Sequence, residues 1–290
     1  MWKGIEEMDL STVGVIGCGL MGSGIAEVCA RAGYSVLVRE ISNDLLQRGL
    51  GRIQNSLSRA AARGKISQEQ ADQTMARIQG TLDLADFAGC DLVVEAAVEN
   101  MDLKKEIFSE LDRVLPPHAI LASNTSSLCI TEMASVTRRG DKILGIHFFN
   151  PVPVMPLIEF VRTILTSDET MATAHDFGAS LGKSMVTAKD TPGFIVNRLL
   201  IPYLLQAVQV YEDGLATRED IDAAIKFGLN HPMGPLTLLD LVGLDTTLFI
   251  ADAMYDEYKD SRYAAPPLLR RMVLAGHLGR KSGKGFYDYS

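Results

Sequence analysis

Residues 12–40, TVGVIGCGLMGSGIAEVCARAGYSVLVRE, decide the fold class of this 290-residue chain. An apolar run rich in valine and isoleucine enters a glycine turn, an alanine-rich stretch follows, and a second apolar run begins at Ser35. This order predicts a βαβ unit, in which a helix joins two parallel strands.

The glycine turn has the spacing G-x-G-x-x-G, formed by Gly17, Gly19 and Gly22. In this context the first glycine permits a tight turn, the second lets the backbone approach a pyrophosphate, and the third lets the helix pack on the strand. The helix then begins at Leu20 and Met21, and its free N–H groups can face phosphates. The turn therefore predicts a dinucleotide site, although a glycine-rich turn without a ligand is the alternative.

Glu40 ends the second apolar run, about 20 residues beyond the glycine turn, where an acidic side chain can bond the ribose hydroxyls. A carboxylate there would repel a 2′-phosphate, which favours NAD over NADP. Arg39 is the counter-argument, because an arginine can accommodate that phosphate, so NADP stays a less favoured alternative.

The rest of the N-terminal half alternates strand-like and helical stretches. Residues 43–79 contain no strand-like run and predict a polar helical hairpin broken near Gly64. The further strand candidates are 91–95, 119–122, 142–148, 157–161 and 185–188, and the further helix candidates are 101–115 and 169–181. We therefore predict a Rossmann-like, mostly parallel sheet covered by helices on both faces.

The pattern changes at Asp190-Thr-Pro-Gly193, after which the apolar spacing is helical only. Thr217 predicts a helix N-terminus, Gly214 and Gly228 predict helix ends, and Pro202 predicts a kink. We expect an α/β NAD-binding domain over residues 1–190 and a smaller all-α domain over residues 191–290.

The composition excludes several function classes. The net charge of −8 argues against nucleic-acid binding, and no apolar run is long enough to span a membrane. The first ten residues lack the apolar core of a targeting signal. The four cysteines are scattered, which favours a reduced, cytoplasmic protein, and no His/Cys/Asp cluster has metal-ligand spacing.

Ligands of open α/β sheets bind at the carboxyl ends of the strands. Those ends carry Glu95, the segment Ser123–Ser127 and His147, which is the one histidine of five at such a position. A lone histidine in an apolar run is more often a core residue than a catalyst. Glu159, in the next apolar run, favours catalysis, because a buried glutamate needs a partner and an imidazole is a suitable one. An exposed strand glutamate is the alternative.

Five sequence blocks resemble, in order, the signature blocks of the L-3-hydroxyacyl-CoA dehydrogenase family. They are Ala122-Ser-Asn-Thr-Ser-Ser-Leu128, His147-Phe-Phe-Asn-Pro-Val-Pro-Val-Met155, Asp190-Thr-Pro-Gly-Phe-Ile-Val-Asn-Arg198, His231-Pro-Met-Gly-Pro235 and Gly279-Arg-Lys-Ser-Gly-Lys-Gly-Phe-Tyr287. The compact chain is similar to bacterial members that act on 3-hydroxybutyryl-CoA, rather than to the large fused β-oxidation proteins. Glu40 is a departure, since the family most often has aspartate there.

The resemblance implies hydride transfer between a 3-hydroxyacyl-CoA and a nicotinamide cofactor. His147 would be the general base and acid, and Glu159 would orient its ring. The implied substrate contacts are Ser126, Asn150 and Asn197, and Asn197 would act from the helical domain. The implied cofactor contacts beyond the glycine turn are Glu99, Lys104, Ser126, Asn150 and Lys281.

A row of arginines marks the helical hairpin. Arg48, Arg52, Arg59 and Arg63 fall on one face of a continuous helix, where a solvated surface is the plain interpretation. The family's CoA-binding hairpin favours a patch for the CoA phosphates, formed by Arg59 and Arg63 with Ser56 nearby. The resemblance also implies a homodimer through the all-α domain.

Two rival functions remain. A gulonate-type dehydrogenase of the same scaffold would share the histidine–glutamate pair but would have no use for the arginine-bearing hairpin. A dinucleotide-binding protein without catalysis would have no use for the set Ser126, His147, Asn150, Glu159 and Asn197. The sequence does not determine the preferred acyl-chain length or the physiological direction.

Overall fold

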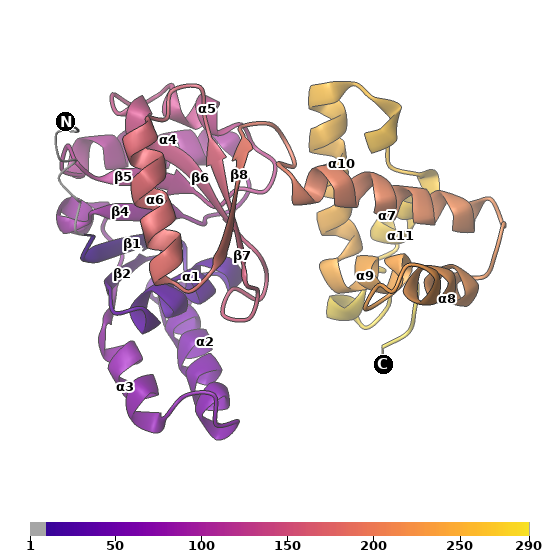
Figure 1. The fold of residues 1–290 in the computed structure, drawn as a ribbon, viewed down its shortest axis with the longest axis horizontal. Coiled ribbons are helices and arrows are strands. Elements are labelled where there is room, and N and C mark those ends of the chain that lie inside the picture. The colour runs from indigo at the N-terminus through magenta and orange to yellow at the C-terminus, as the bar shows by residue number, and fades with distance from the viewer. Residues whose placement is uncertain (1–9, 290) are drawn as a thin grey trace, which may run out of the picture. The chain divides into compact units, whose positions relative to one another are not determined.

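The computed structural model describes residues 10–289, so nearly all of the N-terminal segment that argued against a targeting signal lies outside the described residues. The chain divides into two compact units, Met1–Asp190 and Thr191–Ser290 (Figure 1). Each unit has its own hydrophobic core.

The first unit is built on one eight-stranded sheet with the order β3-β2-β1-β4-β5-β6-β7-β8 in the described residues. Neighbouring strands are parallel except for β6 and β7, which are antiparallel. The strands are β1 (Thr12–Ile16), β2 (Ser35–Arg39), β3 (Ile78–Thr81), β4 (Leu92–Glu95), β5 (Ile120–Ser123), β6 (Ile143–Phe148), β7 (Leu157–Arg162) and β8 (Ser184–Lys189). The predicted Rossmann-like, mostly parallel sheet is confirmed.

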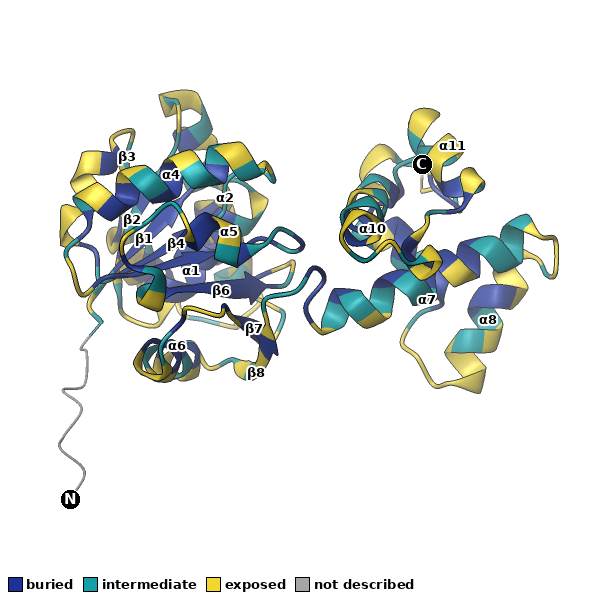
Figure 2. Ribbon diagram, turned by 90° about the horizontal axis from the view of Figure 1, so that it is seen from above, coloured by how far each residue is buried: buried dark blue, intermediate teal, exposed yellow. Residues whose placement is uncertain are grey.

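Helices cover both faces of this sheet, with α4 and α6 on opposite faces (Figure 2). The helices of the first unit are α1 (Leu20–Arg31), α2 (Asn43–Ala62), α3 (Gln68–Ala76), α4 (Met101–Val114), α5 (Ile130–Ala134) and α6 (Asp168–Ser180). Every residue of β4, β5 and β6 is buried, as expected of central strands covered on both sides.

The helical hairpin is present and consists of α2 and α3. Ser42 caps α2, Ser67 forms a capping box on α3, and Gly64 in the turn has a φ of 67°. The prediction that residues 43–79 contain no strand is wrong at its end, because β3 starts at Ile78. Ile78-Gln-Gly-Thr81 has little strand character of its own, and pairing with β2 at the sheet edge determines its conformation.

In its described residues the second unit is built of helices joined by loops, with two isolated β-bridges in the tail, which confirms the predicted all-α domain. Its helices are α7 (Val196–Glu212), α8 (Arg218–Gly228), α9 (Pro235–Val242), α10 (Leu244–Tyr258) and α11 (Pro267–Leu274). As expected, Thr217 caps α8 and Pro202 lies inside α7.

A buried carboxylate anchors the C-terminal tail of the second unit. The two oxygens of Asp240, a residue only 1% exposed, accept 2.9 Å hydrogen bonds from the amides of Phe286 and Tyr287. A Cβ at Gly285 would lie 1.9 Å from Asp240 Oδ1. The tail glycine therefore serves close packing on this carboxylate.

Among the residues described, no helix has both the length and the apolar character that crossing a membrane requires.

Candidate active site

The glycine turn between β1 and α1 has the geometry of a phosphate-binding loop. Gly17 has a φ of 88°, and a Cβ at Gly22 would lie 1.8 Å from the Gly17 carbonyl oxygen. Both positions therefore require glycine. A Cβ at Gly19 would meet nothing within 4 Å, so the backbone there is open to a ligand. These are the three separate requirements of a dinucleotide-binding turn: a tight turn, close approach of the pyrophosphate, and close packing of helix on strand.

The N-terminus of α1 adds an electrostatic preference for an anion. The first turn of this helix, which includes Leu20 and Met21, contains no acidic residue, and no side chain caps it. Its first amides therefore have no intrahelical partner and can bind phosphate.

Glu40 lies directly beside the glycine turn. Its Oε1 accepts a 2.7 Å hydrogen bond from the Cys18 amide, and its Oε2 accepts one of 3.2 Å from the Ile41 amide. Arg39 turns to the backbone, where its Nε donates to the Leu82 carbonyl oxygen over 3.3 Å. Burial, reinforced by the Glu40 carboxylate, raises the pKa of the Cys18 thiol to about 11, so this cysteine stays neutral.

His147 and Glu159 are direct cross-strand partners at the antiparallel junction of β6 and β7. The His147 Nδ1 lies 2.7 Å from Glu159 Oε2, and the two residues are 4% and 0% exposed. A buried carboxylate is costly unless it is paired, so the histidine stabilises the glutamate as much as the glutamate orients the ring. The alternative of an exposed strand residue at Glu159 is wrong.

Ser126 lies on the other side of the imidazole, with its Oγ 3.3 Å from His147 Nε2. The serine belongs to the segment that follows β5. Asn124 connects this segment to β6, since its Oδ1 accepts a 2.9 Å hydrogen bond from the Phe148 amide. The structure therefore brings together three of the predicted catalytic residues, Ser126, His147 and Glu159.

A buried ion-pair network holds the backbone segment that carries Ser126. Lys104 Nζ lies 2.7 Å from Glu95 Oε1 and 3.3 Å from Glu99 Oε2. Glu99 Oε1 accepts a 3.2 Å hydrogen bond from the Ser126 amide and a short one from the Thr125 hydroxyl. The network therefore fixes the backbone at Ser126.

The same network distinguishes two predicted cofactor contacts. Glu99 has a side chain that is 26% exposed and can still meet a ligand. Lys104 is only 1% exposed, and its ammonium group is held between two carboxylates. Its placement here is that of a group that orients Glu99. Glu95, at the end of β4, is fully buried and also accepts a 2.7 Å hydrogen bond from Ser123 Oγ.

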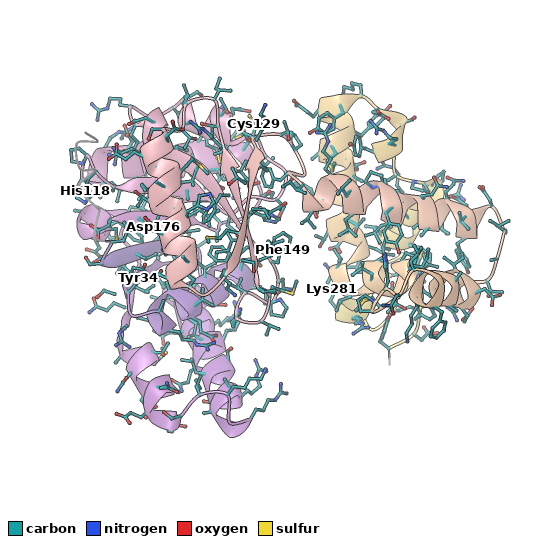
Figure 3. The ribbon with its side chains drawn as sticks, in the orientation of Figure 1. Tyr34, His118, Cys129, Phe149, Asp176 and Lys281 are labelled. Carbon is teal, nitrogen blue, oxygen red and sulfur yellow. The ribbon has the colours of Figure 1, made fainter. Side chains whose placement is uncertain are left out.

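The loop after β6 carries Phe149 and Asn150. The Phe149 ring centroid lies 4.5 Å from that of His147, and Phe149 is labelled in Figure 3. Asn150 is exposed and precedes a cis peptide bond to Pro151. Asn150 is therefore free to contact a ligand two residues beyond the end of the strand that bears the histidine.

The predicted arginine face lies along α2. Arg48, Arg52 and Arg59 are exposed residues of this continuous helix, and Arg63 is exposed one residue past its end. Ser56 lies near the carboxyl group of Glu27 in α1. Burial raises the pKa of that carboxyl group, against the opposing effects of Ser56, Arg31 and Arg59.

Two predicted site residues belong to the second unit. Asn197 lies in the first turn of α7 and is 8% exposed. Lys281, labelled in Figure 3, has its Nζ 2.7 Å from Asp245 Oδ2. The roles assigned to both residues stay predictions.

Sequence reasoning missed several residues that shape this site. The sequence identifies Glu95 only as a strand end, and Asn124 and Phe149 only as members of longer blocks. Their positions at or near strand ends are the available signal in the sequence. The residues that their side chains contact cannot be predicted from it. Among the described residues, no group of three or more His, Cys, Asp or Glu side chains could hold a metal ion.

Two sequence models of one protein family match this chain, one for each unit. The sequence model of the 3-hydroxyacyl-CoA dehydrogenase NAD-binding domain matches residues 12–191, and that of the family's C-terminal domain matches residues 193–289. A Mycobacterium tuberculosis 3-hydroxybutyryl-CoA dehydrogenase is 52% identical over 97% of this chain and 99% of its own length.

Two solved structures are similar in both fold and sequence. The crystal structure of M. tuberculosis FadB2 has a TM-score of 0.96 at 52% identity and covers 97% of this chain and 99% of that one. The (S)-3-hydroxybutyryl-CoA dehydrogenase PaaH1 from Ralstonia eutropha has a TM-score of 0.93 at 45% identity, with 97% and 100% covered. The glycine turn, the paired histidine and glutamate, and these matches over nearly the whole chain lead to one conclusion: this chain belongs to the 3-hydroxyacyl-CoA dehydrogenase family.

Proposed function

We propose that this chain is an NAD-dependent dehydrogenase that interconverts (S)-3-hydroxybutyryl-CoA and acetoacetyl-CoA. The observation that carries the proposal is the buried His147–Glu159 pair with Ser126 at its open side, in a chain of this family. Relatives named as 3-hydroxybutyryl-CoA dehydrogenases support the short acyl chain.

The proton chemistry follows from the orientation of the imidazole. Because Nδ1 faces the Glu159 carboxylate, it carries the proton, and Nε2 presents its lone pair toward Ser126. Nε2 takes the proton of the substrate's 3-hydroxyl group and returns it in the reductive direction. The carboxylate stabilises the imidazolium formed in between, and Ser126 Oγ bonds the substrate oxygen. Asn150 and Asn197 are proposed to complete the substrate contacts.

The residues around the glycine turn fit NAD. The open face at Gly19 and the free amides of α1 are suited to the pyrophosphate, and the Glu40 carboxylate is suited to ribose hydroxyls. Glu99, which accepts a hydrogen bond from the Ser126 amide, is proposed to contact the cofactor. When bound, the nicotinamide accepts the hydride from C3 of the substrate.

Glu40 should determine the choice of cofactor. In Glu40→Gln, the side-chain oxygen can still accept from the Cys18 amide, but the charge that repels a 2′-phosphate is gone. We expect the ratio of kcat/KM for NADPH to that for NADH to rise by roughly 10-fold or more, the equivalent of about 1.4 kcal/mol. Steady-state kinetics with both cofactors measure this ratio. Glu69→Gln, an exposed change on α3, is the control, and an unchanged ratio in Glu40→Gln would assign selectivity elsewhere.

The arginine face should bind the phosphates of CoA. Replacing Arg59 and Arg63 by alanine should raise KM for acetoacetyl-CoA about 10-fold, because two charge-assisted contacts are lost. KM for the acetoacetyl thioester of N-acetylcysteamine, which lacks those phosphates, should stay the same. Arg77→Ala, an exposed arginine at the end of α3, is the control. Equal changes for both substrates would contradict a phosphate patch.

The all-α unit is proposed to form a homodimer. In this unit Phe227 and Leu229 are 76% and 60% exposed, and burying such side chains against a second copy is favourable. The mass of the full chain in solution, measured by light scattering, tests this: the mass of a monomer would contradict it.

The decisive assay is reduction of acetoacetyl-CoA, followed by loss of NADH absorbance, with free acetoacetate and NADPH in parallel. We expect rapid NADH oxidation with the CoA ester and none with the free acid. Activity with a small free hydroxy or keto acid alone would favour the gulonate-type enzyme. NADH binding without turnover of either substrate would favour a non-catalytic dinucleotide-binding protein.

A further inference from the structure

The loop between β6 and β7 joins the histidine strand to the glutamate strand. It comprises Phe149–Pro156, and we call it the β6–β7 loop. Its own hydrogen bonds are few: the amides of Val154 and Met155 both donate to the Pro151 carbonyl oxygen over 2.9 Å. Phe149, beside the His147 ring, and Asn150 stand at its start, so their positions depend on how the loop is held.

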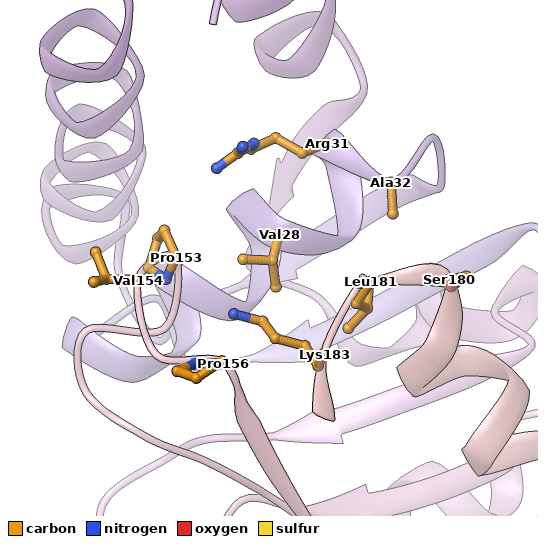
Figure 4. A pocket seen from close by; sticks show the side chains of 10 residues that line it. Val28, Arg31, Ala32, Pro153, Val154, Pro156, Ser180, Leu181 and Lys183 are labelled. Carbon is orange, nitrogen blue, oxygen red and sulfur yellow. The ribbon is translucent and has the colours of Figure 1, made fainter. Parts of the chain in front are cut away.

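Lys183 holds this loop from outside. Its Nζ donates to the carbonyl oxygens of Val152 and Met155, over 2.7 and 2.6 Å. The next residue, Ser184, donates its amide to the Pro156 carbonyl oxygen over 2.7 Å. Figure 4 shows the lysine side chain extending from the turn between α6 and β8 toward Pro153 and Pro156. One ammonium group thus bonds two carbonyls three residues apart.

The opposite side of the loop packs on the dinucleotide-binding helix. Val152 is 2% exposed, and a Cβ at Gly24 in α1 would lie 2.8 Å from the Val152 Cβ. Helix α1 starts at the glycine turn. The loop therefore lies between Lys183 and the helix that follows this turn. Holding Val152 in place therefore couples the position of the proton-transfer pair to that of the cofactor site.

We propose that Lys183 is a positioning residue for hydride transfer, which holds the β6–β7 loop against α1 and keeps Phe149 and Asn150 in register with His147. This inference rests on the proposed function. Lys183 itself touches neither His147 nor the glycine turn in the described contacts, so its effect acts through the loop. A misplacement of about 1 Å can cost roughly 100-fold in rate.

A direct role in binding an anion is the competing explanation. Lys183 and Arg31 both line a cavity of about 410 Å³, whose other walls include Val28 and Leu181 (Figure 4). Two of the three ammonium donors of Lys183 already bond carbonyls, which favours the positioning role. Arg31, by contrast, makes no hydrogen bond to the loop in the described contacts, so the pair Lys183 and Arg31 separates the two explanations.

The test compares Lys183→Met with Lys183→Arg and Arg31→Met. For Lys183→Met we expect kcat for acetoacetyl-CoA reduction to fall about 30-fold, with KM and the NADH dissociation constant within about threefold of wild type. The primary isotope effect, measured with NADH deuterated at the transferred position, should increase because hydride transfer becomes slower. Lys183→Arg keeps a donor pair and should recover most of kcat. Arg31→Met should have wild-type kcat.

Several results would overturn the inference. A fall in kcat accompanied by an equal fall in NADH-binding stoichiometry, with an unchanged isotope effect, would mean that Lys183→Met only lowers the folded fraction. A rise in KM for acetoacetyl-CoA at constant kcat, shared by Arg31→Met, would mean that the cavity binds substrate phosphate. Lys105→Met, at an exposed ion pair with Glu132, is the matched control. An inactive wild-type protein would contradict the proposed function instead, so the two failures are distinguishable.

Discussion

His147→Gln should lower kcat for acetoacetyl-CoA reduction by at least about 10³-fold and leave the NADH dissociation constant within about twofold of wild type. General acid–base catalysis typically contributes 10²- to 10⁴-fold, and a glutamine amide cannot exchange a proton near neutral pH. The substitution preserves a polar side chain of similar length, which can still bond Glu159. Stopped-flow turnover and NADH fluorescence titration measure the two quantities.

The control for this variant is His118→Gln. His118, which is labelled in Figure 3, is a surface histidine whose side chain is 52% exposed and whose Nε2 lies 3.2 Å from Asp91 Oδ1. Its replacement should leave kcat unchanged. A His147→Gln enzyme with near wild-type kcat would remove His147 from the mechanism.

Glu159→Gln should lower kcat by about 10²- to 10⁴-fold, because the imidazolium formed during proton transfer loses its compensating charge at a buried position. The neutral amide is nearly isosteric, so the fold should survive, although a buried pair is altered. Thermal unfolding monitors this. Glu110→Gln, at an exposed position of α4, is the matched control and should behave like wild type.

The double variant His147→Gln/Glu159→Gln tests whether Glu159 acts through the histidine. If Glu159 acts only through the histidine, the double variant should have the same residual kcat as His147→Gln alone. Multiplicative losses would show that Glu159 has a separate function, and an unaffected single variant would show that the buried carboxylate is structural.

The predictable parts of the fold are those that depend on local sequence patterns. The glycine turn, the strand–helix alternation and the change of character after Asp190 are properties of short stretches of sequence, and the sheet and the all-α unit follow from them. The edge strand β3 escaped prediction because Ile78-Gln-Gly-Thr81 adopts its conformation through β2 rather than through its own composition.

Some features of the candidate site were likewise predictable from the sequence, and others were not. Resemblance to a family named most of the polar residues, and strand-end positions singled out Glu95 and His147. The roles assigned to Asn197 and Lys281 stay predictions. Lys104 illustrates the limit: its sequence neighbourhood is that of an ordinary helix surface, yet the side chain is buried between Glu95 and Glu99.

The sequence by itself determined the order and type of the elements, the position of the dinucleotide turn and the family, because each depends on residues close together in the chain. Only the tertiary structure decided which polar groups meet. His147 contacts Glu159 twelve residues later and Ser126 twenty-one residues earlier, and Lys183 reaches back some thirty residues to Val152 and Met155. Such contacts depend on strand register and on the packing of separate elements. A shift of one residue in the pairing of β6 and β7 would turn these side chains to opposite faces of the sheet.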